Sequence, residues 1–328
     1  MTWLGLCGKG VCKMADYVRR EYPQWSWSFS RQQTLTSCLR RYYYNYYGSH
    51  NGWESGATAE AALAYRLKKL SNLYLVLGDA LHKSAYYMVE RVLAGKVLPG
   101  ADFVEEEIRR QLRKVWKSSR DDRDLFLRRP NRVDMLQEFY YQMEVSEETL
   151  AKINERIKQV SRAIVASTVW GELGARGVEL ISCEQFDTFT IDGTPVFAVP
   201  DLLYRSSEGS WTIVDWKTGD EVGDNQDQVA LYALYVQNKH KVPAEKIIAR
   251  LEYLSLQTQR QLTFTPEDLM VVEEKARASM KKMRDLLIDP AENIPKSKKA
   301  FVLTDSRGLC PWCNFYELCK GELERSVS

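Results

Sequence analysis

The stretch VFAVPDLLYRSSEGSWTIVDWKTG, at residues 196–219, decides the fold. It contains two segments rich in Val, Ile, Phe, Leu and Tyr, at 196–205 and 211–217. The sequence SSEGS at 206–210 lies between them and is typical of a turn. The stretch therefore predicts a hairpin of two antiparallel strands.

The predicted hairpin brings two carboxylates together. Alternation with period two puts Ile213, Asp215 and Lys217 on one strand face. Residues paired across a turn centred on residue 208 have numbers that sum to about 416, which places Asp201 opposite Asp215. Facing carboxylates repel each other, and a hard divalent ion such as Mg²⁺ or Mn²⁺ removes that conflict. An alternative interpretation is a solvated strand face with a minor surface ion pair.

The sequence on either side of the hairpin predicts an α/β core joined to an inserted helical block. Apolar residues recur at helical spacing between Ala59 and Leu93, with a break near Ser71–Leu73. Ser30 is a suitable N-cap for a helix that continues past Cys38. Further strands are expected at 178–190, 249–256 and 259–264, and further helices at 227–238 and from Pro266 to about Leu287.

Composition places the chain among ordinary globular proteins. Of its 328 residues 45% are apolar and 27% are charged, which excludes disordered, collagen-like and coiled-coil classes. The formal net charge is only +2, so bulk charge does not demand a polyanionic partner and any basic surface must be local. No apolar run approaches the roughly 18–20 residues that span a bilayer. Because the first residues also lack a signal-peptide pattern, we expect a cytoplasmic protein without membrane contact.

An ordered set of residues resembles the RecB-like branch of the PD-(D/E)XK nuclease superfamily. The set comprises His82, Asp201, Asp215-Trp216-Lys217 and Gln228-x-x-x-Tyr232. The resemblance extends over about residues 26 to 320. It implies a restriction-endonuclease-like core, which is a mixed central sheet flanked by helices.

The resemblance also implies a role for each residue of the set. Mg²⁺ or Mn²⁺ would be held by His82, Asp201, Asp215 and the backbone carbonyl of Trp216. Catalytic roles would fall to Asp201, Asp215, Lys217, Gln228 and Tyr232, with Lys217 orienting the nucleophile. Glu184 is a possible additional acidic residue near the metal, and otherwise an ordinary charge at a strand edge.

Three of the seven cysteines crowd into the C-terminal tail as C-x2-C-x5-C, at Cys310, Cys313 and Cys319. Cys38 is the best candidate for a fourth thiolate, while Cys7 and Cys12 stay unassigned. This split pattern resembles iron–sulfur nucleases of the same branch, namely the AddB-like and CRISPR-associated adaptation exonucleases. It implies a [4Fe–4S] cluster on four thiolates, which would act as a structural clamp. The alternatives are a Zn²⁺ site and unligated buried cysteines.

With the tail included, five segments are expected. They are an N-terminal extension at 1–25, a helical part with Cys38 and His82 at 26–99, a helical insertion at 100–176, the nuclease α/β core at 177–290 and a cysteine-rich iron–sulfur tail at 291–328.

Cations and rings alternate along residues 31–47, where Arg31, Arg40 and Arg41 interleave with five tyrosines. Cations that follow phosphates and rings that stack on bases are typical of single-stranded nucleic acid binding. The alternative is a helix with a tyrosine core face and a solvated arginine face. A second basic group, at Arg109, Arg110, Arg113 and Lys114, is interpreted as a solvated helix face.

The expected function is a metal-dependent DNA nuclease that acts as an exonuclease on single-stranded DNA or DNA ends. Recombination repair, CRISPR adaptation and phage DNA processing all use such domains. The chain has no nucleoside-triphosphate motif, so a helicase partner would be a separate chain. The alternative function is a catalytically silent module on the same fold that binds DNA or a partner protein.

Overall fold

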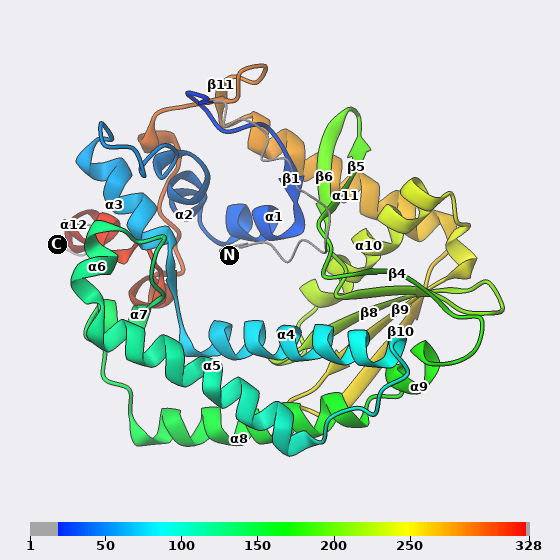
Figure 1. Cartoon of the computed structure of the whole chain (residues 1–328). Helices are drawn as coiled ribbons and strands as arrows, with labels where there is room; N and C mark the ends of the chain where they lie inside the picture. The colour runs from blue at the N-terminus through cyan, green and yellow to red at the C-terminus, as the bar shows by residue number, and fades with distance from the viewer. Residues whose placement is uncertain (1–18, 326–328) are drawn as a thin grey trace.

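A five-stranded mixed sheet forms the centre of the computed structural model, which describes residues 19–325 (Figure 1). Its strand order is β10-β9-β8-β7-β4, and only β8 and β9 run parallel. The strands are β4 (Glu179–Cys183), β7 (Leu202–Arg205), β8 (Trp211–Lys217), β9 (Ile247–Tyr253) and β10 (Thr258–Thr263). The expected mixed sheet of an α/β protein is confirmed.

The predicted hairpin is β7 and β8, joined in the register that the sequence indicates. Leu202 pairs with Val214 and Leu203 with Ile213, so Asp201, directly before β7, lies across from Asp215. The alternation along β8 is also confirmed, because Ile213 and Val214 are buried in two different apolar cores on opposite sides of the sheet.

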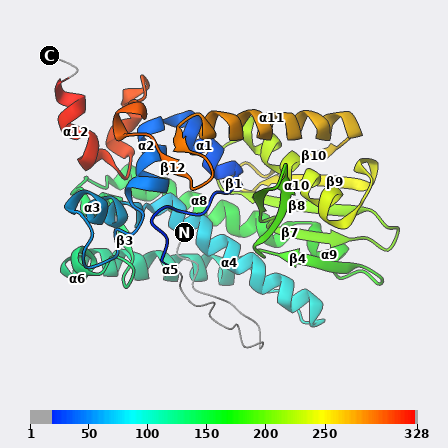
Figure 2. The same cartoon turned by 90° about the horizontal axis from the view of Figure 1, so that it is seen from above.

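Helices cover both faces of the sheet (Figures 1 and 2). One face packs against α10 (Asp224–His240), with α11 (Pro266–Arg284) beside that helix. The other face packs against α4 (Leu73–Leu93), α9 (Val169–Leu173) and, outside them, α5 (Ala101–Asp121) and α8 (Glu147–Ala166). The apolar stripe of α4 explains its place, because Leu77, Leu81 and Met88 recur at helical spacing and are fully buried.

The remaining elements are short helices, most of them at the end of the molecule beside the sheet, and short accessory strands. The helices there are α1 (Phe29–Ser37), α2 (Leu39–Tyr43), the π-helix η1 (Tyr44–Gly48), α3 (Ala59–Lys68), α6 (Arg123–Arg128), α7 (Gln137–Tyr140) and α12 (Tyr316–Arg325). Three short 3₁₀ segments are η2 (Ala244–Lys246), η3 (Lys298–Ala300) and η4 (Arg307–Trp312). The accessory strands are β1 (Trp27–Ser28), β2 (Leu70–Ser71), β3 (Met135–Leu136), β5 (Asp187–Ile191), β6 (Thr194–Ala198), β11 (Leu287–Asp289) and β12 (Ile294–Pro295).

Two strand predictions are wrong in their boundaries. The segment 178–190 is not one strand but β4 and β5, which belong to different sheets. The segment 196–205 likewise divides into β6 and β7. The breaks have local causes, since Glu184 adopts a left-handed φ of 51° and Pro200 has no N–H to donate to a ladder.

The first helix also differs from its prediction. Its N-cap is Ser28 rather than Ser30, and the Ser28 hydroxyl accepts a hydrogen bond from the Arg31 N–H. The helix does not continue past Cys38, whose φ of −167° and ψ of 119° are extended. Cys38 therefore separates α1 from α2 and caps the start of α2.

The helical block at 100–176 packs onto the core instead of standing apart. Residues of α5 and α8 share an apolar core with α4 and with Val214 and Trp216 of the sheet. Among the described residues, no helix combines the length and the apolar character that crossing a membrane requires.

Candidate metal centre and active site

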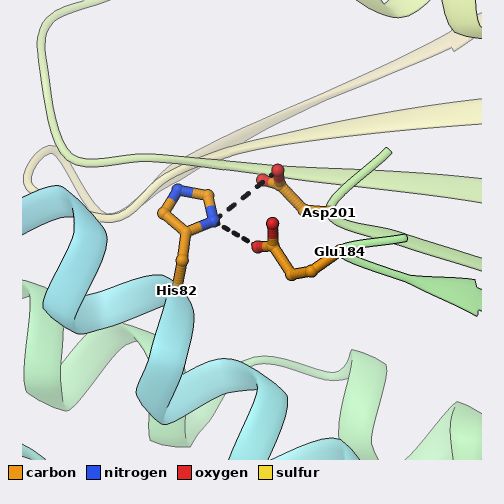
Figure 3. Close-up of side chains that lie close together, drawn as sticks. All are labelled: His82, Glu184 and Asp201. Carbon is orange, nitrogen blue, oxygen red and sulfur yellow. Dashed lines mark hydrogen bonds and ion pairs between the residues drawn. The ribbon is translucent and has the colours of Figure 1, made fainter. Parts of the chain in front are cut away.

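His82, Glu184 and Asp201 converge where α4 lies beside the adjoining ends of β4 and β7 (Figure 3). His82 Nδ1 lies 2.7 Å from Glu184 Oε1 and 3.6 Å from Asp201 Oδ1. One ligand atom from each residue lies within 4.8 Å of the other two. An imidazole and two carboxylates at this separation can hold a divalent cation.

Three elements position this group. His82 projects from the third turn of α4, while Glu184 follows β4 and Asp201 precedes the neighbouring β7. The Glu184 N–H donates to the Asp201 carbonyl at 3.1 Å, which extends the pairing of the two strands by one residue. The left-handed backbone of Glu184 is a local strain that neighbouring contacts maintain, and such strain is typical of functional sites.

Asp201 is tied to the neighbouring strand through its second oxygen. Asp201 Oδ2 accepts a hydrogen bond from the Trp216 N–H at 2.7 Å. In an extended strand, the N–H and C=O of one residue point to the same edge. The Trp216 carbonyl therefore faces the same edge as Asp201, whereas the Lys217 carbonyl accepts from Leu254 N on the β9 side. The expected carbonyl ligand is thus directed toward the candidate centre.

Asp215 is fully buried beside this group, with 1% of the residue exposed. Its Oδ2 lies 2.7 Å from Lys217 Nζ as an ion pair. This oxygen accepts no well-aligned hydrogen bond within the described residues, so it keeps free lone pairs. Asp215 is outside the compact group of three ligands, although its charge acts on both Asp201 and His82.

A chain of contacts runs from Asp215 to α10. Lys217 Nζ donates to Gln228 Oε1 at 2.9 Å, and Gln228 Nε2 donates to the Tyr232 hydroxyl at 2.8 Å. Gln228 and Tyr232 are spaced i, i+4, so both side chains project from one face of α10. The structure therefore brings the three predicted residues Lys217, Gln228 and Tyr232 together.

The electrostatics of this centre favour added positive charge. Burial raises the pKa of the Asp201 carboxyl, and the charges of Asp215 and Glu184 raise it further. Burial lowers the pKa of His82, but the carboxylates of Asp201 and Glu184 outweigh burial and the net shift is upward. Burial likewise lowers the pKa of Lys217, and the charges of Asp215 and Asp201 reverse that shift.

The residues present fit a divalent metal ion. Three carboxylates, from Glu184, Asp201 and Asp215, lie around one permanent cation, Lys217. A divalent ion supplies the missing charge, and carboxylate and imidazole groups are suitable ligands for Mg²⁺ or Mn²⁺. The free lone pairs of the buried Asp215 oxygen are consistent with such a ligand set.

A family model described as "PD-(D/E)XK nuclease superfamily" matches residues 26–320 of this chain. The match spans most of the chain, and the chain belongs to this superfamily of metal-dependent nucleases. No curated protein matches the sequence.

The tail cysteines lie near Cys38 but do not form a tight group. Within the described residues, all of the cysteines are free thiols, and no three of the sulfurs of Cys38, Cys310, Cys313 and Cys319 lie within 4.8 Å of one another. Their proximity shows in their electrostatics, because a charge on Cys38 raises the pKa of each of the other three thiols, although burial is the larger cause. Cys7 and Cys12 lie outside the described residues.

Arg40 joins Cys38 to the tail. Its side chain donates from Nε to the Phe301 carbonyl at 2.8 Å and from Nη1 to Glu322 at 2.6 Å. The Arg40 backbone N–H also donates to the Val302 carbonyl at 3.2 Å. These bonds hold the start of α2 against the segment that leads to the three tail cysteines.

The expectation that the tyrosine-rich stretch stacks on bases is wrong for most of its residues. Tyr42 and Tyr44 are fully buried, and Arg40 is 4% exposed. This stretch is therefore mainly core, which was the alternative interpretation. The basic face of α5 is neutralised in part, because Arg109 and Arg110 pair with glutamates on their own helix.

The sequence alone leaves open whether Glu184 lies at the metal centre. The register of β4 and β7 would place it there, since Cys183 pairs with Leu202 and the next pair outward is Glu184 with Asp201. That register depends on the pairing of β4 with β7, which have β5 and β6 between them in the chain and no turn signal to fix the partner.

Proposed function

We propose that this protein is a metal-dependent deoxyribonuclease that hydrolyses phosphodiester bonds in single-stranded DNA or at DNA ends. The observation that carries the proposal is the convergence of His82, Glu184 and Asp201 beside Asp215 and Lys217. Carboxylates that can hold a divalent ion beside a half-buried lysine suit phosphodiester hydrolysis. Such an ion and the ammonium would counter the negative charge of the phosphate, and the ion would activate the attacking water.

Each residue has a distinct task in this proposal. His82, Glu184, Asp201, Asp215 and the carbonyl of Trp216 would hold Mg²⁺ or Mn²⁺. When bound, such an ion lowers the pKa of a water molecule and polarises a phosphate oxygen.

Lys217 supplies the chain's own positive charge at this point. Its ammonium stays protonated at neutral pH because the neighbouring carboxylates raise its pKa. It can therefore orient the attacking water and stabilise charge that develops on the phosphate. Gln228 holds the ammonium from the α10 side, and Tyr232 holds Gln228.

We also propose that Cys38, Cys310, Cys313 and Cys319 bind a [4Fe–4S] cluster that clamps the N-terminal helices to the tail. The Arg40 contacts with Phe301 and Glu322 support this, because they already hold the two segments together. Four thiolates suit a [4Fe–4S] cluster, and Zn²⁺ is the alternative occupant.

The test of the nuclease proposal is an end-labelled DNA assay. Single and double strands labelled at the 5′ or 3′ end are incubated with Mn²⁺, Mg²⁺ or chelator. The proposal expects metal-dependent cutting of single strands, with stepwise shortening from an end. The catalytically silent alternative expects binding without products under every condition.

A further inference from the structure

A cavity of about 380 Å³ lies apart from the metal centre, between the N-terminal helices and β6. Among residues 19–325, cations and aromatic side chains line it, and no carboxylate does. The cations are Arg31, Lys68 and Lys69, and the aromatic side chains that matter below are Tyr46, Trp53 and Tyr65. Its volume is within the range of about 300–1,000 Å³ of small-ligand pockets.

Arg31 is a buried cation whose hydrogen-bond partners among the described residues are all neutral. It is 4% exposed, and its Nη1 donates to the Ser26 carbonyl at 2.9 Å while its Nε donates to the Tyr42 hydroxyl at 3.2 Å. Its guanidinium lies 4.4 Å from the centre of the Tyr46 ring. Within residues 19–325 no carboxylate forms an ion pair with Arg31, Lys68 or Lys69.

The two lysines increase this unbalanced positive charge. The packing around its ammonium lowers the pKa of Lys68 to about 8 by desolvation, although the residue as a whole is exposed, and the charges of Lys69 and Arg31 lower it further. Lys68 Nζ donates to the Asn45 carbonyl at 2.6 Å, which is again a neutral partner. Cations that destabilise one another next to an open cavity make a favourable site for an anion.

Aromatic surface lies beside these cations. Trp53 is 44% exposed, and its ring packs edge-on against Tyr65 with 5.5 Å between centroids. An exposed indole held by a neighbouring ring offers a face on which a nucleobase can stack.

We propose that this cavity binds one nucleotide of a single DNA strand, with its phosphate at Lys68 and Lys69, beside the buried charge of Arg31, and its base on Trp53. The identity of the ligand rests on the proposed nuclease function. The cavity is a substrate-binding subsite, because two of the segments that line it are followed in the chain by residues of the metal centre. Helix α4 begins shortly after Lys69 and carries His82 about 14 Å along its axis. Phe197, which lines the cavity, lies on β6 just ahead of Asp201.

The test is DNA binding without cutting. A fluorescent oligodeoxythymidylate of about 12 nucleotides is titrated in chelator with the full-length protein, at several salt concentrations. The variants are Lys68→Ala with Lys69→Ala, and Trp53→Ala. Lys282→Ala is the matched control, because Lys282 is exposed on α11, outside the cavity lining. Arg31 stays unchanged, since its side chain is part of the core packing.

The proposal expects the double lysine variant to bind at least about tenfold more weakly and to lose roughly 0.7 from the slope of log K against log salt, which corresponds to one phosphate contact. Trp53→Ala weakens binding about fivefold or more. Wild-type affinity and an unchanged slope in the double lysine variant would overturn the subsite.

The same variants separate this inference from the nuclease proposal. In cleavage assays with Mn²⁺, the double lysine variant has a higher KM for DNA than the wild-type protein, and its kcat at saturating DNA equals the wild-type value. A wild-type protein that binds the oligonucleotide through these lysines and never cuts it contradicts the nuclease proposal alone. Oligonucleotides with and without a terminal phosphate then distinguish a strand end from an internal nucleotide, and either source supports the subsite.

Discussion

Lys217 donates a hydrogen bond from its amine to Gln228 Oε1 at 2.9 Å, across the boundary between β8 and α10. The same amine forms an ion pair with Asp215, so Gln228 fixes the position of the lysine that lies beside the carboxylate group. Gln228 is thus a positioning residue that acts through Lys217.

Gln228→Ala should lower kcat by up to about 10²-fold with little change in KM, because the lysine loses one of its two anchors. Lys217→Ala should cost about 10²–10³-fold. Single-strand cleavage rates, with melting temperatures as a check on folding, measure both effects. Gln226→Ala is the matched control, since Gln226 is exposed in the first turn of the same helix. A rate for Gln228→Ala equal to that of the control would refute the positioning role.

Glu184→Gln should weaken Mn²⁺ binding by about tenfold or more, because it removes a carboxylate that lies 2.7 Å from His82. Calorimetric titration and the Mn²⁺-induced rise in melting temperature report this loss. Glu179→Gln is the control on the same strand, where Glu179 is exposed and pairs with Arg205. Equal Mn²⁺ affinity in the two variants would remove Glu184 from the ligand set.

Cys313→Ser should lower both iron content and melting temperature, because the proposed cluster joins Cys38 to the tail. Cys183→Ala should keep its iron, since Cys183 lies on β4 in the sheet core. Metal analysis and the visible spectrum of anaerobically purified protein provide the measurement. A colourless protein with stoichiometric zinc would contradict the cluster, and unchanged stability after complete loss of iron would contradict the clamp.

Binding of single-stranded DNA in the cavity should weaken as the pH rises from about 7 to 9. The pKa of Lys68 is lowered to about 8, so its ammonium loses its proton in this window, and the charge that attracts phosphate is lost. The facing cations Lys69 and Arg31 are the groups that act on it electrostatically. Binding titrations in chelator at each pH test this, with Lys68→Met as the variant in which the dependence should flatten. An equally steep fall in that variant would exclude Lys68 as its cause.

Local patterns in the sequence were sufficient for the centre of the fold. The turn at 206–210 determined the register of β7 and β8, and period-two alternation assigned Ile213 and Val214 to opposite faces. The spacing of Gln228 and Tyr232 similarly placed both side chains on one helix face.

Features that depend on long-range contacts could not be predicted in this way. The pairing of β4 with β7 places Glu184 next to His82, and no local signal specifies that pairing. The extended backbone at Cys38 is another case, because Arg40 holds the following helix against residues near position 301. The burial of Tyr42 depends on the same tertiary packing, which cannot be predicted from the amino-acid composition of the stretch.

The most direct test of the account compares the wild-type protein with Asp215→Asn in the cutting of end-labelled single-stranded DNA at saturating Mn²⁺. Asparagine preserves the size of the side chain, so the melting temperature should stay within a few degrees while the cleavage rate falls by about 10³-fold or more. Chelator should stop the wild-type protein completely. Cutting by Asp215→Asn at the wild-type rate, or cutting in chelator, would contradict the claim that this carboxylate helps to hold the metal that breaks the DNA chain.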